Sequence, residues 1–279
     1  MTVAQCVSNA DSIIQCIHDA AKNGASLAVF PELCITSYTC GDLFLQTALQ
    51  KKAERELLRI AEQTASDACI AAAGLPFYKD GALYNCAAVI CGGKIAGIVP
   101  KTFIPNYSEF YERRYFTPAP MTAVSAAAIH TAGTVNCTTA AGYSYNSQTV
   151  TIGNQTNIPF GTDIFFTLTD VADFVLACEI CEDMWVPLPP STRHALAGAT
   201  VIANLSASNE IIGKAAYRRT LVSSQSARIT GAYIYSDAGH GESTQDVVFA
   251  SHNIIAENGT ILAESKLFSA DKNSCTLVY

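Results

Sequence analysis

Residues 174–181 read Phe-Val-Leu-Ala-Cys-Glu-Ile-Cys, a short apolar run that ends immediately before two acidic residues. Such a run is typical of a strand buried inside a sheet. Outward from it, further apolar runs alternate with stretches of helical periodicity, which predicts a mixed sheet covered by helices in an α/β fold. The expected strands are 27–30, 69–75, 201–205 and 232–235, the expected helices are 9–22, 46–66, 191–198 and 213–229, and two hairpins turn at 92–93 and 257–259.

The first helix illustrates how these limits are drawn. Asn9 is a residue type that favours helix N-caps, and Gly24 provides a stop signal. By contrast, residues 119–160 are rich in Ala, Ser, Thr, Asn and Gly, with little apolar periodicity. We expect this segment to form an irregular arm on a single α/β domain that spans residues 1–279.

Three polar residues follow predicted strands directly: Glu32, Lys101 and Cys181. Functional groups in α/β sheets gather beyond the carboxyl ends of strands. Together these residues could transfer an acyl group from an amide, with a thiolate nucleophile, a carboxylate that moves the proton and an ammonium that steadies the oxyanion. Each also has a purely structural interpretation, as a core thiol, a helix-capping acid and an exposed turn lysine.

Two other cysteine chemistries compete with this hypothesis. His194, His240 or His252 could pair with a cysteine, although none lies in a pattern that marks it. Cys178 and Cys181 form a C-x-x-C, but a structural zinc site needs two more ligands at a compatible spacing, and none is evident. We therefore expect no metal.

Composition excludes some partners. The net charge is −7 and no Lys/Arg-rich run occurs, which argues against binding to nucleic acid. The start of the sequence lacks a secretory leader, and no apolar run approaches membrane-spanning length, so we expect a cytoplasmic protein without membrane association. Only 15% of the residues are charged, which favours a homo-oligomer with buried subunit contacts.

Five stretches carry a family resemblance: FPELCITSYTCGDLF (30–44), KTFIPNYSEFYERRYF (101–116), EICEDMWVP (179–187), ANLSASNEIIGKAAYRR (203–219) and AGHGESTQDVVF (238–249). They resemble the glutaminase domain of glutamine-dependent NAD synthetases, a cysteine amidase of the nitrilase superfamily. The resemblance runs from about residue 3 to about residue 268. It implies a four-layer αββα sandwich, which goes further than the mixed sheet inferred from periodicity alone.

Residue by residue, the resemblance implies that Glu32 is the general base, Lys101 the positive residue and Cys181, rather than Cys178, the nucleophile. Glu109 is chosen over Glu112 as a second glutamate that orients Lys101. The implied glutamine pocket consists of Tyr38, Tyr107, Phe110, Glu182 and Ser208, with the Glu182 carboxylate suited to the substrate ammonium group.

The implied activity is the release of ammonia from L-glutamine, without a cofactor. A synthetase domain or subunit would then use the ammonia, ATP and Mg to convert nicotinic acid adenine dinucleotide to NAD. No Ser-Gly-Gly phosphate loop occurs in this sequence, so we expect that domain to be absent. Only Met1 and Thr2 precede the matching region, so we also expect a missing first strand and an exposed sheet edge. The alternatives are a nitrilase-type amidase for another small amide, such as an ω-amidase or carbamoylase, and a catalytically silent assembly module.

Overall fold

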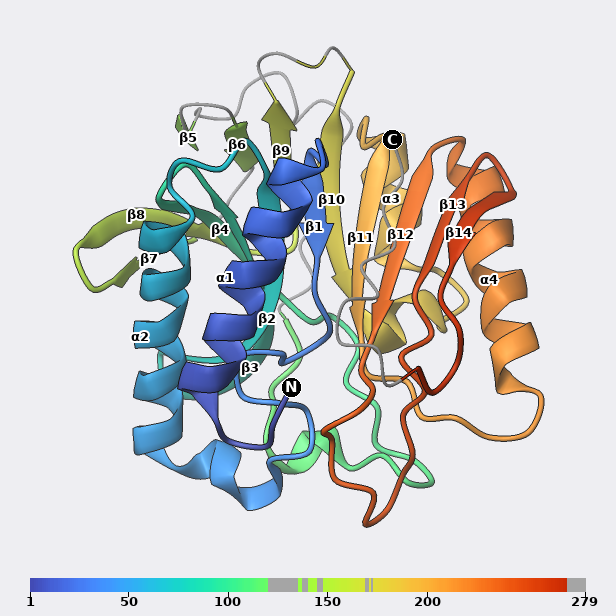
Figure 1. The fold of residues 1–279 in the computed structure, drawn as a ribbon, viewed down its shortest axis with the longest axis horizontal. Helices are drawn as coiled ribbons and strands as arrows, with labels where there is room; N and C mark the ends of the chain where they lie inside the picture. The colour runs from blue at the N-terminus through green and yellow to red at the C-terminus, as the bar shows by residue number, and fades with distance from the viewer. Residues whose placement is uncertain (120–134, 137–139, 145–147, 169–170, 172, 270–279) are drawn as a thin grey trace.

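The computed structural model describes residues 1–119, 135–136, 140–144, 148–168, 171 and 173–269. The described chain is built in four layers, helices on sheet on sheet on helices (Figure 1). Helices α1 (Cys6–Lys22) and α2 (Thr47–Gln63) cover one sheet, and α3 (Pro190–Leu196) and α4 (Lys214–Ile229) cover the other. The expected αββα sandwich is therefore confirmed.

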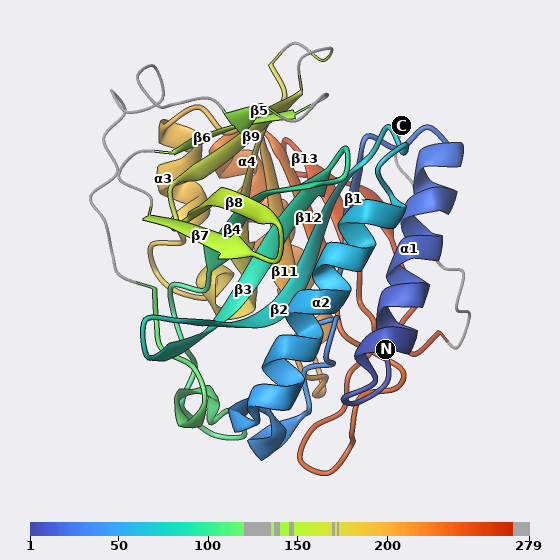
Figure 2. The same cartoon turned by 90° about the vertical axis from the view of Figure 1, so that its left-hand side faces the viewer.

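The first sheet has six strands and mixed direction. Its β1 and β2 are parallel, β2, β3 and β4 form two successive antiparallel hairpins, and β8 joins β4 in parallel (Figure 2). The short β1 lies at one edge of the sheet. In spatial order the strands are β1 (Leu27–Val29), β2 (Ile70–Lys79), β3 (Ala82–Cys91), β4 (Lys94–Pro100), β8 (Gln155–Phe160) and β7 (Gln148–Ile152).

The second sheet has eight strands, with β10, β11 and β12 parallel at its centre. The expected final hairpin is confirmed as β13 and β14, which pair across Asn258 and Gly259. In spatial order the strands are β14 (Thr260–Glu264), β13 (Ile254–Glu257), β12 (Ala232–Asp237), β11 (Val201–Ser206), β10 (Val175–Ile180), β9 (Ile164–Leu168), β6 (Ala140–Ser144) and β5 (Val135–Asn136).

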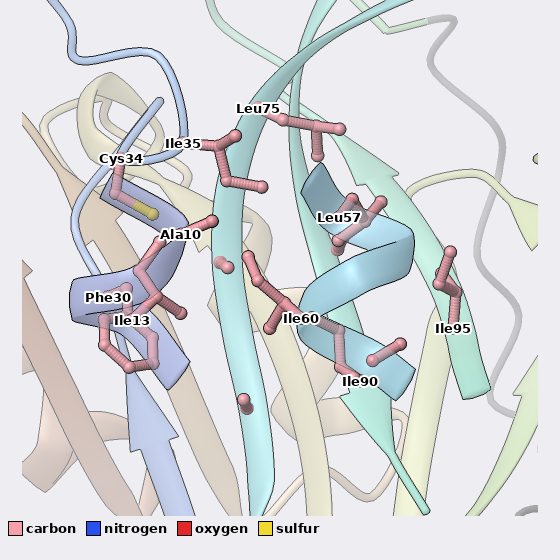
Figure 3. Packing of buried hydrophobic residues seen from close by; sticks show 14 of the residues in the cluster. Ala10, Ile13, Phe30, Cys34, Ile35, Leu57, Ile60, Leu75, Ile90 and Ile95 are labelled. Carbon is pink, nitrogen blue, oxygen red and sulfur yellow. The ribbon is translucent and has the colours of Figure 1, made fainter. Parts of the chain in front are cut away.

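Apolar periodicity produces three stacked cores. Ile13 on α1 and Leu57 and Ile60 on α2 pack against the outer face of the first sheet (Figure 3). A second core lies between the sheets and includes Val89 and Phe166, while a third separates the second sheet from α3 and α4. Because burying a large aliphatic side chain contributes about 1.5–3 kcal/mol, these layers fix how the two sheets face each other.

Some boundaries differ from those expected. α1 begins at Cys6, and Asn9 does not cap it but lies within its first turns, where its amide donates to the carbonyls of Thr2 and Ile35. β2 runs on to Lys79 and turns at Asp80 and Gly81 into β3, a hairpin that the periodicity did not indicate.

The irregular arm predicted for residues 119–160 is wrong in most of its described part, and residues 135–136 and 140–144 already form β5 and β6 of the second sheet. Residues 148–160 form β7 and β8, which continue the first sheet beside β4 (Figure 2). Their polar, Asn- and Thr-rich composition hides the strand pattern because β7 is largely exposed. Residues 120–134, 137–139 and 145–147 lie outside the described residues. Within the part of the chain that is described, no helix is both long and apolar enough to cross a membrane.

Candidate functional site at the carboxyl ends of the strands

Glu32, Lys101 and Cys181 follow β1, β4 and β10, and all three are buried. Lys101 Nζ lies 2.6 Å from Glu32 Oε1, across the first sheet. Cys181 comes from the second sheet, and the charges of Glu32 and Lys101 both act on its thiol. The structure therefore brings Glu32 and Lys101 together, and both are close enough to Cys181 to affect the pKa of its thiol.

The Glu32 carboxylate is held firmly on one oxygen. Its Oε1 accepts hydrogen bonds from Asn85 Nδ2 and Lys101 Nζ, both at 2.6 Å. The other oxygen, Oε2, is buried and has no hydrogen-bond partner among the described residues. Burial raises the pKa of Glu32 to about 7, although the nearby Lys101 charge opposes that rise. A buried carboxylate with a free oxygen and a near-neutral pKa suits proton transfer.

Gly74 makes the position of Glu32 possible. The chain segment that carries Glu32 crosses β2 so closely that a Cβ on Gly74 would lie 2.2 Å from Leu33 N and 2.8 Å from Pro31 O. The Ile35 N–H donates to Gly74 O at 3.1 Å, and this bond ties the segment to the strand. Glycine is required at position 74 because backbone packs directly on backbone there.

The second carboxylate on Lys101 belongs to Glu112 and not to Glu109. Lys101 Nζ donates to both Glu112 oxygens, at 3.0 and 2.9 Å, and the Tyr38 hydroxyl donates to Glu112 Oε1 at 2.8 Å. Glu109 instead accepts a hydrogen bond from Asn209. The prediction failed because the chain doubles back after Lys101. The Glu112 N–H bonds Pro105 O, and the short 3-10 helix η2 (Glu112–Arg114) begins there.

Cys181 begins a tight turn after β10. Its φ is 45°, a left-handed value that is uncommon for a residue with a side chain, and its N–H donates to Asn204 Oδ1 at 3.2 Å. The 3-10 helix η4 (Cys181–Met184) follows. Burial raises the pKa of the thiol, and Glu32 adds to that rise while Lys101 opposes it. Cys181 therefore keeps its thiol proton at neutral pH unless a neighbouring base accepts it.

Asp183 joins the nucleophile turn to the segment that follows Lys101. Its carboxylate accepts the Phe103 N–H at 2.8 Å and the Ile180 N–H at 2.9 Å. Hydrogen bonds from backbone N–H groups fix a buried carboxylate. Asp183 therefore holds the end of β10 close to the segment that follows β4. This function of Asp183 was missed from the sequence, although the residue lies in the quoted stretch EICEDMWVP.

Three of the predicted substrate residues, Tyr107, Phe110 and Glu182, form a group with Lys214 that we call the mouth of the site. The Tyr107 hydroxyl donates to Glu182 at 3.0 Å, and the Phe110 ring packs edge-on against Tyr107 with 5.9 Å between centroids. Lys214 was not predicted, yet its ammonium lies 5.6 Å from the Phe110 ring centroid and 5.1 Å from that of Trp185. Burial lowers the pKa of Lys214, and the charge on Cys181 opposes that effect. This mouth therefore offers one carboxylate and one ammonium.

The remaining two predicted substrate residues, Ser208 and Tyr38, make their hydrogen bonds elsewhere. Ser208 is buried, with its N–H on Asp237 Oδ1 at 2.8 Å and its hydroxyl accepting from Arg218 at 3.2 Å. Tyr38 lines a cavity of about 150 Å³ together with Phe110, Glu109, Glu112 and residues 243 and 245–247.

The histidine and zinc alternatives find no support in these contacts. His194 Nε2 lies 3.1 Å from Thr162 O, and burial lowers the pKa of His194 to about 4. His252 lies between Arg218 and Glu264, and His240 is exposed. Cys178 is buried in the core between the sheets. In the described ranges, no group of three or more His, Cys, Asp or Glu side chains could hold a metal ion.

Comparison with known proteins agrees with this geometry. Residues 4–272 match the family described as carbon-nitrogen hydrolase. Glutamine-dependent NAD(+) synthetases are similar in sequence: the Mycobacterium tuberculosis H37Rv protein is 40% identical over 267 residues, and the Saccharomyces cerevisiae protein is 28% identical over 263. The alignments cover 96% and 94% of this chain but only 36% and 34% of those proteins.

Solved structures give the same picture. A glutamine-dependent NAD(+) synthetase from Cytophaga hutchinsonii superposes with a TM-score of 0.76 at 28% identity, over 96% of this chain and 39% of that chain. An amidase of the nitrilase superfamily from Nesterenkonia superposes with a TM-score of 0.68 at 15% identity, over 96% of this chain and 83% of that chain. The second likeness is one of fold alone.

Proposed function

The chain belongs to the carbon-nitrogen hydrolase family, and from this premise we propose that it hydrolyses the side-chain amide of L-glutamine and releases ammonia. One observation carries the proposal: a base and an ammonium 2.6 Å apart, both fully buried, act on the thiol of Cys181. A thiol whose pKa is raised by burial reacts only when a neighbouring base accepts its proton, and Glu32 has a free oxygen for that purpose.

The reaction would proceed in two halves. Cys181 Sγ attacks the amide carbon while Glu32 takes the thiol proton, and Glu32 then delivers that proton to the nitrogen. The C–N bond breaks, ammonia leaves and a thioester remains on Cys181. Glu32 next deprotonates a water molecule that attacks the thioester carbon. The C–S bond breaks, glutamate leaves and the thiol regains its proton. Lys101 holds Glu32 and faces the oxyanion in both halves.

The mouth of the site supports glutamine among small amides. An α-amino acid carries an ammonium and a carboxylate, and the mouth presents Glu182 and Lys214 to pair with them. Tyr107 and Phe110 supply apolar contact for the methylene groups. Tyr38 and Ser208 would act more indirectly, through Glu112 and through Arg218. An ω-amidase substrate without the α-ammonium would leave Glu182 with the Tyr107 hydroxyl but no cationic partner, at a cost in affinity.

The consumer of the ammonia would be an NAD synthetase domain or subunit. This proposal follows from the printed names of the similar proteins, of which the chain spans only about a third. ATP and Mg would belong to that partner, and the amidase step itself would need no cofactor. We further propose that the protein is a cytoplasmic homo-oligomer. Exposed apolar residues on and beside α3 and α4, among them Leu196, Ile212 and Tyr217, support self-association.

The deciding experiment measures ammonia released from L-glutamine by the purified chain, alone and with an added NAD synthetase domain. Cys181→Ala should lose the activity completely. Cys178→Ala is the matched control, because Cys178 is an equally buried thiol on β10, three residues before Cys181, and it should retain most of the activity. Equal loss in both variants contradicts the assignment of the nucleophile.

Substrate and cofactor controls complete this test. Faster turnover of an ω-amide that lacks the α-amino group would move the assignment to an ω-amidase. No turnover of any amide by the folded chain, with or without the synthetase domain, would favour a silent assembly module. Addition of a chelator should leave the rate unchanged, and a chelator-sensitive rate would contradict the mechanism.

A further inference from the structure

The turn Ser37–Thr39 lies at the edge of the cavity beside Glu112, and its backbone is strained. Ser37 has a φ of 78°, in the left-handed region that residues with a Cβ rarely adopt. Such a conformation is unfavourable for a residue with a Cβ and persists only when surrounding contacts hold it. Ser37 is buried and directly precedes Tyr38, so the strain lies one residue from a side chain that contacts Glu112.

The contacts that hold this turn come from one carboxylate, Glu242, on the loop between β12 and β13. Its oxygens accept the Tyr38 N–H at 2.8 Å and the Thr39 N–H at 2.9 Å, together with the hydroxyls of Ser37 and Thr39. Four donors converge on one anion, and hydrogen bonds to a charged acceptor are about twice as strong as neutral ones. Glu242 is half-buried, so solvent screens these bonds only in part.

The same loop also contacts the ring of Tyr38. Phe249 packs against it edge-to-face with 5.7 Å between centroids. With its backbone on Glu242 and its ring on Phe249, Tyr38 has its hydroxyl directed to Glu112 Oε1 at 2.8 Å. Glu112 in turn accepts two hydrogen bonds from Lys101. A continuous set of contacts therefore leads from the 238–249 loop to the ammonium of the site.

We propose that Glu242 is a positioning residue, which holds the strained Ser37–Thr39 turn so that Tyr38 fixes Glu112 and, through it, Lys101. It touches no substrate. The catalytic part of this inference rests on the proposed function, because it assumes that Lys101 and Glu32 act on Cys181 chemistry. Loss of the contact is expected to misplace the ammonium while leaving the Glu182 and Lys214 mouth intact.

The first test is a double-mutant cycle in glutamine hydrolysis. Glu242→Gln should lower kcat about tenfold, with KM changed less than about twofold, because misplacement affects the chemical step more than binding. Tyr38→Phe keeps the ring and removes the hydroxyl, and it should have a similar effect. The double variant should be no slower than the worse single one, because both changes break the same path. Additive losses would overturn the proposal.

Two further variants separate positioning from general damage. Ser37→Gly should restore much of the kcat of Glu242→Gln, because glycine adopts a φ near 78° without strain. Glu257→Gln is the matched control, an exposed glutamate on the neighbouring hairpin, and should leave kcat unchanged. A failure of Ser37→Gly to restore activity would show that the turn conformation is not what Glu242 supplies.

A second readout does not depend on glutamine. Iodoacetamide alkylates a cysteine faster when a base assists its thiol, and peptide mass spectrometry follows Cys181 alone. Alkylation of Cys181 should be slower in Glu242→Gln, by about the factor seen in kcat. If the wild-type chain releases no ammonia but the variant still slows alkylation, the proposed function fails and this inference stands. Unchanged alkylation in a folded variant overturns the inference itself.

Discussion

The two sheets supply the candidate site in different ways. The first sheet provides Glu32 and Lys101, and its outer core is a cluster of apolar side chains, with Ala71, Ala73 and Ala88 among the residues packed under α1 and α2. The second sheet provides Cys181 and carries polar side chains within its own layers. Asn204 accepts from the Cys181 N–H and donates to the Tyr233 hydroxyl, which bonds Glu179.

This difference teaches how each partner is positioned. Glu32 and Lys101 are positioned by backbone packing, through the close approach at Gly74, and by the ion pairs that Lys101 makes with Glu32 and Glu112. Cys181 is positioned by a network of side-chain hydrogen bonds that continues into the second sheet through Asn204. Substitutions in the first sheet should therefore damage charge balance or backbone shape, whereas substitutions in the second should loosen a hydrogen-bonded support.

The largest effect is expected from Lys101→Met, which keeps much of the side-chain volume and removes the charge. Glu32 and Glu112 would then be buried together without a cation, at a cost of about 3–5 kcal/mol in stability. Activity should fall about a thousandfold, because the positive group at the oxyanion is lost. Urea unfolding and ammonia release measure the two effects.

Lys94→Met is the control for Lys101→Met, because Lys94 begins β4, the strand that Lys101 follows. Lys94 is exposed, and its replacement should change stability by less than about 0.5 kcal/mol. If Lys101→Met unfolded no more easily than this control, the balance of buried charges described above would be wrong.

The next effect is expected from Gly74→Ala in the first sheet. The new Cβ would meet Leu33 N at 2.2 Å, so the segment that carries Glu32 must move. A displacement of the base by about 1 Å should lower kcat about a hundredfold. Gly81→Ala is the comparison, because its Cβ would meet nothing within 4 Å although its φ is +84°. That variant should lose stability through backbone strain and keep its kcat.

The sequence predicted the parts of this molecule that obey simple periodicity. Helices, buried strands and the residues at strand ends were recognised because burial on one face leaves a regular apolar pattern. Glu112 could not be distinguished from Glu109 because both follow Lys101 within a few residues. The chain turns back in this segment through the hydrogen bond from Glu112 N–H to Pro105 O, which the sequence does not indicate. Lys214 was overlooked because it is placed at the site by contacts with the rings of Trp185 and Phe110, which are distant in sequence.

The pH dependence should reveal the base in the first sheet. Burial raises the pKa of Glu32 to about 7, against the opposing Lys101 charge. Because Glu32 must be ionised to act, kcat/KM should fall about tenfold per pH unit below about pH 7. A profile that stays level down to pH 5 would exclude Glu32 as the base.

Stability should respond to pH in the opposite sense. The folded pKa of Glu32 exceeds the ordinary value of 4.5, so the folded chain retains a proton that the unfolded chain releases. The stabilising contribution of this group is therefore present below about pH 4.5 and is lost as the pH rises through about 7. Glu32→Gln, compared with the wild-type chain in urea unfolding across this range, should weaken the dependence. Asp183, whose pKa burial also raises to about 7, contributes with the same sign in both proteins.

The smallest effect is expected from Tyr233→Phe, which tests the polar support of the second sheet. The change removes a buried hydroxyl that joins Glu179 to Asn204, and leaves both with an unmatched polar atom. Stability should fall by about 1–3 kcal/mol, and kcat only a few-fold, because Asn204 still accepts the Cys181 N–H. Tyr78→Phe, at an exposed residue near the end of β2, should change neither. If Tyr233→Phe lowered kcat as much as Gly74→Ala, the side-chain network would be as important for Cys181 as backbone packing is for Glu32. The contrast between the two sheets would then be wrong.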